Sequence, residues 1–388
     1  MYKFKNGLNK GKGSFGFGTP IINYTDVYKH RGLTREMVKG LVKLDANEIR
    51  RYKVKKGDVF FTRTSETPEE VGLASVLLED IDDCSFSGFV LRGRPITDDL
   101  EFDYCKECFS VHAVRDSIIK TCTYTTRALT NGTVLSKIPI TIPPKEEQKT
   151  IASYFSSLDS LIYSTSKKIE SLKQVKAASL QSMFPQEGET IPGVRFKGFE
   201  GEWESVTLGE IAEMQSGGTP SSHNSEYYNG NIPFLSITDM TNAGKYINST
   251  IKSITEYGLA NSSARIYPAG TLMYAMYASL GKCSITNIDV AISQAILGFS
   301  LSNEIDREFL YQYLCNIESS IKCFGQTGTQ TNLSKSIVEK FNILIPTLSE
   351  QKLVGNLLSS LDSQISLQTQ RLEKLKQIKS ACLDNMFV

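Results

Sequence analysis

The sequence predicts an α+β protein with an internal pseudo-two-fold repeat: two globular, mixed α/β domains separated by two long α-helices that form an antiparallel coiled coil. Three observations support this prediction: one long internal duplication, heptad spacing of apolar residues in both copies, and short apolar runs bounded by turn residues elsewhere. With 388 residues, the chain is too long for one ordinary core and suits two or three domains. Its 40% hydrophobic and 22% charged residues are typical of folded globular proteins.

The duplication defines the organisation of the chain. Residues 137–184 align with residues 340–387 at a constant offset of 203 without a gap, and about 22 of the 48 positions are identical. The longest shared word, Ser-Ser-Leu-Asp-Ser, stands at 156–160 and again at 359–363. Solenoid repeats have periods of about 50 residues or fewer, so a period this long indicates two copies of one domain-plus-helix module.

Apolar residues in each copy recur at the four-three spacing of a coiled-coil seam. The expected seam positions are Ile151, Phe155, Leu158, Ile162, Ile169 and Leu172 in the first copy, and Val354, Leu358, Leu361, Ile365, Leu372 and Leu375 in the second. The seam is interrupted at equivalent places by Thr165, Gln368, Lys176 and Lys379. At the two lysines, the preceding Val175 and Ile378 are expected to supply the apolar contact.

A strand, a proline turn and a long helix close each module. The apolar runs that end at Pro143 and Pro346 read as strand ends, because proline is tolerated there but not inside a helix. A helix from Glu147 to Phe184 would be roughly 57 Å long and could not bury its seam alone. Equal length and matching interruptions favour pairing of the two helices with each other, and a helical hairpin inside each domain is the alternative.

Domain boundaries follow from these elements and from a linker rich in Pro, Gly and Glu. The predicted order is a first domain at 1–144 whose N-terminal part is missing, a central helix at 145–184, a linker at 185–199, a second domain at 200–346, and a C-terminal helix at 347–388. The segments 1–134 and 200–332 differ in sequence but share an outline of mixed strands and helices. Strands are expected at 19–24, 57–63, 232–237 and 270–276, and a helix at 307–321.

Three words near the start of the second module resemble the opening of a target recognition domain in the specificity (S) subunits of type I restriction-modification systems. These words are Phe-Lys-Gly-Phe-Glu-Gly-Glu-Trp at 196–203, Leu-Gly-Glu-Ile at 208–211 and Ser-Gly-Gly-Thr-Pro at 216–220. The resemblance extends to Asn-Leu-Ser at 332–334 and to the Pro-x-x-x-Glu-Gln words at 143–148 and 346–351. It covers essentially the whole chain.

This resemblance implies a sequence-specific DNA-binding subunit without catalytic activity. Each recognition domain would bind one half of a bipartite, asymmetric target in double-stranded DNA, and the helices would set the spacing and dock two methyltransferase (M) subunits. S-adenosylmethionine, ATP and Mg²⁺ would be bound by partner subunits, which include motor-nuclease (R) subunits, and none by this chain. The alternative from another class is a coiled-coil protein-interaction scaffold without DNA binding.

One departure from the expected pattern concerns the first module. It has no sequence counterpart to about 30 residues that open the second, from Phe199 through the Ser216-Gly217-Gly218 region. Three explanations stay open: the first domain is truncated, it is completed by a partner or by the C-terminal end, or the pseudo-symmetry of the family tolerates the loss.

Candidate DNA contacts are polar and basic residues in predicted loops, because Arg, Lys, Asn and Gln match base edges and hydroxyls match phosphates. For each of them a solvated-loop or structural role is the alternative. In the first module they are Lys10, Lys12, Ser14, Arg63, Thr64, Ser65, Arg127 and Asn131. In the second they are Ser216, Thr219, Ser221, Ser222, Asn224, Tyr227, Tyr228, Tyr274, Tyr277, Ser279, Lys282, Gln326, Thr329 and Gln330.

Other motifs carry less information. The pair Cys105 and Cys108 resembles half a zinc site without a second pair nearby, so structural thiols are expected. The three histidines are isolated, and the N-terminal glycines miss the spacing of a phosphate loop. The net charge of +1 requires local basic surfaces for any DNA contact. Without an apolar run of about 18 residues or a signal peptide, a bacterial or archaeal cytoplasmic location is expected, with no membrane contact.

Overall fold

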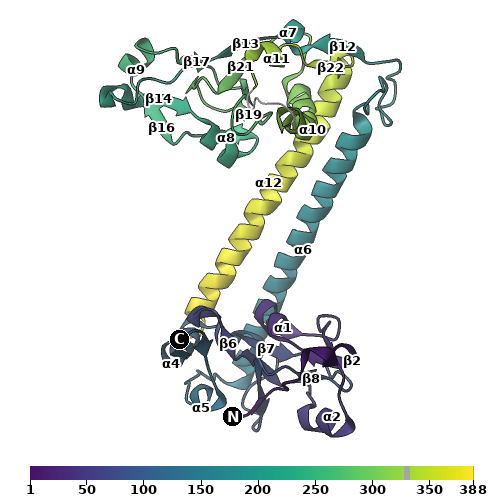
Figure 1. Cartoon of the computed structure of the whole chain (residues 1–388), viewed down its shortest axis with the longest axis vertical. Helices are drawn as coiled ribbons and strands as arrows, with labels where there is room; N and C mark the ends of the chain where they lie inside the picture. Colours follow the sequence, from purple (N-terminus) through teal and green to yellow (C-terminus); the bar gives the residue numbers. More distant parts are fainter. Residues whose placement is uncertain (327–332, 388) are drawn as a thin grey trace. The chain divides into compact units, whose positions relative to one another are not determined.

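The computed structural model describes residues 1–326 and 333–387, which divide into two compact units. Unit 1 contains residues 1–167 and 369–388, and unit 2 contains residues 168–368. Two long helices, α6 (Lys145–Met183) and α12 (Leu348–Asn385), each contribute to both units (Figure 1). Their bounds agree closely with the two helices expected from the duplication.

Both units contain a five-stranded sheet with the same strand order. In unit 1 the order is β1-β9-β5-β7-β3, and in unit 2 it is β13-β21-β18-β19-β15. In each sheet the first four strands pair antiparallel and the last pair is parallel. The bounds are β1 Tyr2–Asn6, β3 Gly32–Leu33, β5 Val59–Thr62, β7 Ala74–Leu77, β9 Val90–Pro95, β13 Ala212–Ser216, β15 Tyr246–Ile247, β18 Leu272–Ala275, β19 Cys283–Thr286 and β21 Ile296–Leu301.

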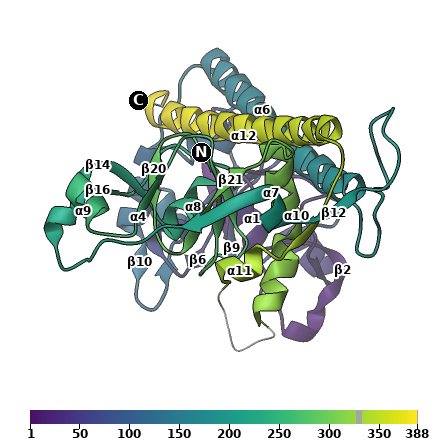
Figure 2. The same ribbon diagram turned by 90° about the horizontal axis from the view of Figure 1, so that it is seen from above.

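A second sheet repeats as well. Its order is β4-β2-β8 in unit 1 and β16-β14-β20-β17 in unit 2, where β14, β16 and β20 lie with α9 at one side of the unit (Figure 2). Both β2 and β14 carry a register shift in the same place, and each has a parallel partner: β2 pairs with β8, and β14 pairs with β20. The bounds are β2 Phe15–Ile22, β4 Leu41–Val42, β8 Ser85–Phe86, β14 Tyr228–Leu235, β16 Lys252–Ile254, β17 Arg265–Tyr267 and β20 Val290–Ile292.

Short helices and hairpins complete each unit. Unit 1 contains α1 Tyr24–Lys29, α2 Ala46–Tyr52, α3 Cys105–Cys108, α4 His112–Thr121, α5 Gly132–Leu135, β6 Thr64–Ser65, β10 Thr123–Tyr124 and β11 Ala128–Leu129. Unit 2 contains α7 Leu208–Ile211, α8 Ile237–Ala243, α9 Glu256–Ala260, α10 Arg307–Gln326, α11 Lys335–Val338, and the antiparallel pair of β12 Glu204–Thr207 with β22 Asn342–Ile345. The five elements predicted in the globular parts therefore correspond to β2, β5, β14, β18 and α10.

The predicted seam is buried or half-buried at every position, and the antiparallel packing is visible inside each unit. In unit 1, Ile151 and Phe155 near the start of α6 share a core with Leu383 near the end of α12. In unit 2, Leu172 from the second half of α6 packs on the core that holds Val354, Leu358 and Leu361 of α12. Apolar burial at this spacing is the main force that holds two such helices together.

The expected contacts of Val175 and Ile378 are wrong. These side chains are 52% and 38% exposed. Instead, the lysines occupy the seam: Lys176 Nζ lies 2.5 Å from Asp362 Oδ1, and Lys379 Nζ lies 2.5 Å from Asp159 Oδ1. The long lysine stem covers apolar surface while the ammonium group reaches a carboxylate of the facing helix. The two pairs are exact counterparts at the offset of 203.

The glutamine of each Pro-x-x-x-Glu-Gln motif, at 143–148 and at 346–351, has a structural role. Gln148 Oε1 accepts from Glu101 N at 2.7 Å, and its Nε2 donates to Asp99 O and Pro143 O. Gln351 does the same with Asp306 N at 2.8 Å, Glu304 O and Pro346 O. Both glutamines are fully buried, so each satisfies three backbone groups at the start of a long helix.

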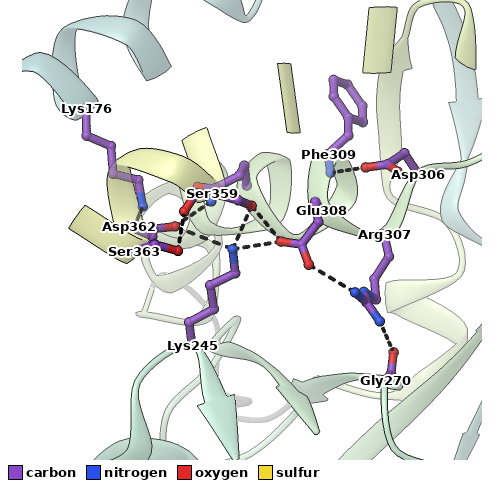
Figure 3. Close-up of polar contacts among 11 residues, drawn as sticks. Lys176, Lys245, Gly270, Asp306, Arg307, Glu308, Phe309, Ser359, Asp362 and Ser363 are labelled. Carbon is purple, nitrogen blue, oxygen red and sulfur yellow. Dashed lines mark hydrogen bonds and ion pairs between the residues drawn. The ribbon is translucent and has the colours of Figure 1, made fainter. Parts of the chain in front are cut away.

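A network of charged side chains anchors α12 to the globular part of unit 2 (Figure 3). Lys245 Nζ lies 2.7 Å from Glu308 Oε2 and 3.7 Å from Asp362, and it donates to Ser359 Oγ at 2.8 Å. Burial acts to raise the pKa of Glu308, but hydrogen bonds from Lys245 and Ser359 hold the pKa below its usual range. In unit 1, Arg31 stands directly before β3, as Lys245 stands directly before β15 in unit 2, and Arg31 forms an ion pair with the buried Glu107.

The gap at the start of the first module is narrower than the sequence predicts. Strand β1 occupies the place of β13 in the sheet. The hydrogen bond that Ile96 N donates to Met1 O matches the one that Ser302 N donates to Ile211 O. Met1 is therefore the counterpart of Ile211, and the Ser216-Gly217 region has its counterpart at Asn6-Gly7. Within the described residues, the elements of unit 2 without a partner in unit 1 include β12, α7, β22 and the extra strand β17, because residues 139–142, the counterpart of β22, form no strand.

Candidate nucleic-acid interface

Unit 1 gathers candidate residues around a surface concavity of about 230 Å³. Thr64 and Ser65 of β6 line it together with Arg127, because β6 pairs with β11 directly after that arginine. Arg127 Nη2 lies 3.2 Å from Glu66 Oε1, and both side chains are well exposed. The sequence-predicted residues at 64, 65 and 127 thus converge on one place.

A hydrogen-bond network forms the wall of this concavity. Ser65 Oγ donates to Glu70 Oε2 at 2.5 Å and lies 2.7 Å from Tyr24 OH, while Tyr28 OH donates to Glu70 Oε1. The bond to Glu70 also raises the pKa of the Tyr28 hydroxyl. The rings of Tyr24 and Tyr28 stack at 5.8 Å. Carboxylates beside an arginine suit base edges better than phosphates, since phosphates repel carboxylates.

In unit 2 the turn between β18 and β19 gathers three predicted residues. Ser279 Oγ lies 3.2 Å from Thr241 Oγ1, and Lys282 Nζ donates to Thr241 O at 3.2 Å. Tyr277 is exposed beside them, and Ala278 has φ of 57°. A non-glycine residue in the left-handed region is strained, and such strain is often stored at functional sites.

The loop before β14 holds the other predicted residues of unit 2. Thr219 Oγ1 donates to Gln294 Oε1 at 2.5 Å, and Tyr228 OH donates to Pro220 O. Ser221 and Ser222 are exposed, and Ser216 ends β13 half-buried. Asn224 caps a turn and Tyr227 packs against Tyr257, so these two have structural contacts within the loop.

Several candidates have contacts within the protein, and one of them is excluded from the surface. Tyr274 is completely buried in the core of unit 2, so its prediction as a DNA contact is wrong: β18 is a central strand with both faces covered. Arg63 donates inward to Gly88 O, and Asn131 caps α5. Lys10 pairs with Glu48 at 2.7 Å. Ser65 is also mostly buried and acts through its hydrogen bonds.

Two candidates lie apart from these groups. Lys12 is exposed and Ser14 half-buried in the turn before β2, which the concavity does not include. Thr329 and Gln330 lie outside the described residues, and only the backbone of Gln326, the last residue of α10, is described.

Sequence reasoning missed two residues in equivalent loops. Phe89 is 57% exposed and lines the concavity of unit 1, and the exposed Gln294 meets Thr219 in unit 2. Both follow the strand of the second sheet that pairs in parallel with β2 or β14. In the sequence, each of them is only a single polar or aromatic residue between two apolar runs. That pattern is too common to indicate a binding residue.

The cysteine pair lies in the core of unit 1. Cys105 and Cys108 are buried, and Tyr2 OH lies 3.3 Å from Cys105 Sγ. Burial raises the pKa of the Cys108 thiol. Among the residues that the structure describes, no three His, Cys, Asp or Glu side chains are grouped so that they could hold a metal ion. In the same residues, no helix is long and apolar enough to cross a membrane.

Comparisons with known proteins agree on one family. The model of the type I restriction modification DNA specificity domain matches residues 3–174 and 200–377. A putative type I restriction enzyme MjaX specificity subunit of Methanocaldococcus jannaschii is 24% identical over 261 residues, 66% of this chain and 59% of that protein. The MjaVIII specificity subunit of the same organism is 27% identical over 65% of this chain and 61% of that protein. The chain thus spans about three fifths of the length of these relatives.

Solved structures support the fold. The S subunit of a type I restriction-modification system from M. genitalium has a TM-score of 0.64 and 16% identity, covering 100% of this chain and 94% of that one. A chain from a structure concerned with assembly and conformational transition of the type I system has a TM-score of 0.55 and 17% identity, covering 100% and 97%. Because the family model matches most of both modules, the chain belongs to the family of type I restriction-modification DNA specificity proteins.

Proposed function

We propose that this chain is the DNA-recognition subunit of a type I restriction-modification complex, in which each unit binds one half of a bipartite, asymmetric DNA target. The observation that carries the proposal is one two-sheet topology built twice with different side chains at its loops. Arg127 and Phe89 stand at the loops of unit 1, whereas Lys282 and Gln294 stand at those of unit 2. Equal scaffolds with unlike donors and acceptors suit two different half-sites.

The proposal gives this chain no catalytic step. The side chains gathered at the candidate interface are hydrogen-bond donors, acceptors and aromatic rings, which are suited to recognition. Methyl transfer from S-adenosylmethionine would be performed by two methyltransferase subunits, and ATP and Mg²⁺ would serve motor-nuclease subunits. The two long helices, 39 and 38 residues in length, are proposed to dock the methyltransferases and set the spacing of the half-sites.

An exchange of one recognition segment tests the proposal. Residues 200–332 are replaced by the corresponding segment of another specificity subunit, and the chain is expressed with its methyltransferase. Methylated adenines are then mapped by single-molecule sequencing. We expect one half-site to change and the other to persist. A change in both half-sites, or no methylation by the wild-type complex, contradicts the assignment.

Single substitutions test the residues. Arg127→Ala and Lys282→Ala should each weaken binding of the assembled complex to its own target by roughly tenfold or more, because one base or phosphate contact is lost. Lys120→Ala on α4 and Lys335→Ala on α11 are matched controls, since both lysines are exposed outside the two groups of residues described above. Equal effects of test and control variants would refute the placement of the interface.

Two further measurements separate this function from a protein-interaction scaffold. Affinity of the complex for duplex DNA should fall steeply with salt, because phosphate neutralisation releases counterions. Insertion of four residues into both α6 and α12 should lengthen the gap of the target while both half-sites stay the same. A scaffold without a DNA function predicts neither result.

A further inference from the structure

One face of the β1–β9 pair in unit 1 carries like charges directly opposite one another. Lys3 lies opposite Arg94, and Lys5 lies opposite Arg92. Phe4, between the two lysines, points to the other face and packs against the core of unit 1. Like charges placed directly across an antiparallel strand pair are destabilising. A local arrangement that costs stability in this way is expected chiefly at functional sites.

The last turn of α2 adds a fifth cation to this face. Lys5 Nζ donates to Arg51 O. The Lys5 ammonium and the Arg51 guanidinium both lie over the ring of Tyr52, at 5.1 and 5.5 Å from its centre. Lys3 and Arg51 are exposed to solvent, whereas Lys5 is half-buried. We call this surface the basic face, and it consists of Lys3, Lys5, Arg51, Arg92 and Arg94.

Asp58 is the single carboxylate that pairs with the basic face in the part of the chain that the structure describes. Arg94 Nε lies 2.7 Å from Asp58 Oδ1, Arg94 Nη2 lies 2.6 Å from Oδ2, and Arg92 Nε lies 3.9 Å from Oδ2. Burial and repulsion from the four neighbouring cations lower the pKa of Lys5. Five cations against one carboxylate give a local excess of positive charge in a chain whose net charge is only +1. Any DNA contact of such a chain requires a surface of this kind.

Unit 2 has no cation at the equivalent strand positions. Strand β13 pairs with β21 in the same register as β1 with β9. The counterparts of Lys3, Arg94, Lys5 and Arg92 are, in this order, Glu213, Ser300, Gln215 and Gly298. A Cβ at Gly298 would lie 2.5 Å from the ring of Tyr267, so an arginine does not fit there. Because the same sheet forms without these charges, the fold does not require them, and they are a property of unit 1.

The basic face adjoins a loop that lines the concavity of unit 1. Gly88 N donates to Leu8 O at 2.7 Å, and the next residue, Phe89, lines the concavity. Leu8 follows Lys5 by three residues, which span at most about 11 Å. The major groove of DNA is about 12 Å wide. Phosphates that border a groove whose base edges meet the concavity therefore come within reach of the basic face.

We propose that the basic face binds backbone phosphates of duplex DNA beside the half-site that unit 1 reads. This inference rests on the proposed function and adds to it a contact that holds DNA without reading bases. Interfaces with DNA are much more positively charged than interfaces between proteins, whose centres are depleted of charged residues. The basic face therefore suits DNA better than an acidic protein segment. Unit 1 contributes more than unit 2 to the affinity that does not depend on sequence.

A salt titration of the complex with its methyltransferase subunits tests the proposal. The double variant Lys3→Gln with Arg51→Gln removes two exposed charges. Affinity for the complex's own target and for an unrelated duplex should fall by the same factor, roughly tenfold, because phosphate contacts carry no sequence information. The slope of log affinity against log salt should become shallower by about two, since each neutralised phosphate contributes about 0.9. Methylation mapping should return an unchanged target sequence.

Two further double variants are the controls. Lys3→Arg with Arg51→Lys keeps both charges and should keep the wild-type slope. Lys120→Gln with Lys137→Gln removes two exposed charges elsewhere in unit 1 and should leave the slope unchanged as well. Circular dichroism confirms that all three variants fold.

The outcomes separate this inference from the proposed function. If the wild-type complex binds its own target specifically, an unchanged slope in Lys3→Gln with Arg51→Gln overturns the phosphate contact alone. An equal change in the Lys120 control, or a loss of affinity confined to the complex's own target, overturns it too. A folded variant that no longer assembles with the methyltransferase would assign the basic face to a protein partner and contradict the proposal. A wild-type complex without affinity for any duplex would overturn the proposed function and this inference together.

Discussion

Units 1 and 2 have the same strand order in the five-stranded sheet, the same register shift and the same buried glutamine. Within the described residues, however, the two-stranded sheet of β12 and β22 is present in unit 2 and has no counterpart in unit 1. The linker brings Arg195 to the buried Glu350 and leads into β12, whereas Glu147, the counterpart of Glu350 in unit 1, is exposed. The comparison shows which parts of the scaffold are constant: strand pairing and helix anchoring recur, whereas the β12–β22 pair and the side chains of the loops differ.

The largest difference between the units is expected at Glu350 and its counterpart Glu147. Arg195→Ala should reduce the free energy of unfolding of unit 2 by about 3–5 kcal/mol, because Glu350 is left buried without its cation. Glu147→Gln in unit 1 should cost less than about 0.5 kcal/mol, since that carboxylate is exposed. Urea unfolding followed by fluorescence of Trp203, the only tryptophan in the chain, reports on unit 2. The double variant Arg195→Ala with Glu350→Gln should recover most of the loss, and no recovery would contradict a charge effect.

Substitution of the two buried glutamines should destabilise the two units equally. Gln148→Ala and Gln351→Ala are each expected to cost about 2–3 kcal/mol, because each leaves buried backbone groups without partners. Hydrogen exchange of the amides at Glu101 and Asp306 measures the local loss in each unit. Effects that differ by more than about 1 kcal/mol would show that the two helix starts are not equivalent.

The sequence predicted the parts of the molecule that depend on periodicity. The heptad spacing located every seam residue, and the duplication located both long helices, because burial repeats along a helix at a fixed interval. It placed Lys176 and Lys379 at seam positions but assigned the contact there to the neighbouring Val175 and Ile378, because the sequence pattern does not show that a lysine stem can cover apolar surface while its ammonium group pairs with a carboxylate.

The candidate interface was less predictable. Thr64 and Arg127 meet only because β6 pairs with β11, a long-range contact that no local pattern encodes. Tyr274 was misplaced because a tyrosine at the end of a strand reads alike whether the strand is central or at an edge. The length of the segment that the first module lacks was overestimated from the sequence. The reason is that β1 and β13 occupy the same position in their sheets but have hardly any identical residues.

Smaller effects distinguish the two seam pairs. A double-mutant cycle on Lys176 and Asp362 should give a coupling of about 1–2 kcal/mol, because both side chains are only 20% exposed and Asp362 also accepts from Gln312. The counterpart cycle on Lys379 and Asp159 should give about 0.5 kcal/mol or less, since Asp159 is 48% exposed. Couplings that are equal, or larger in unit 1, would refute burial as the cause. Added salt should reduce the second coupling more than the first.

The smallest effect is expected at a position where the units differ by one oxygen atom. Tyr274 of β18 corresponds to Phe61 of β5, and its buried hydroxyl has no hydrogen-bond partner among the described residues. Removal of an unsatisfied buried hydroxyl should be neutral or stabilising, so Tyr274→Phe should change the free energy of unfolding by at most about 1 kcal/mol in the favourable direction. Phe61→Tyr should instead destabilise unit 1, because it adds a hydroxyl to the core. Methylation mapping should give the same DNA target for Tyr274→Phe as for the wild-type chain. A changed half-site would show that Tyr274 takes part in DNA recognition, against the conclusion drawn from its burial.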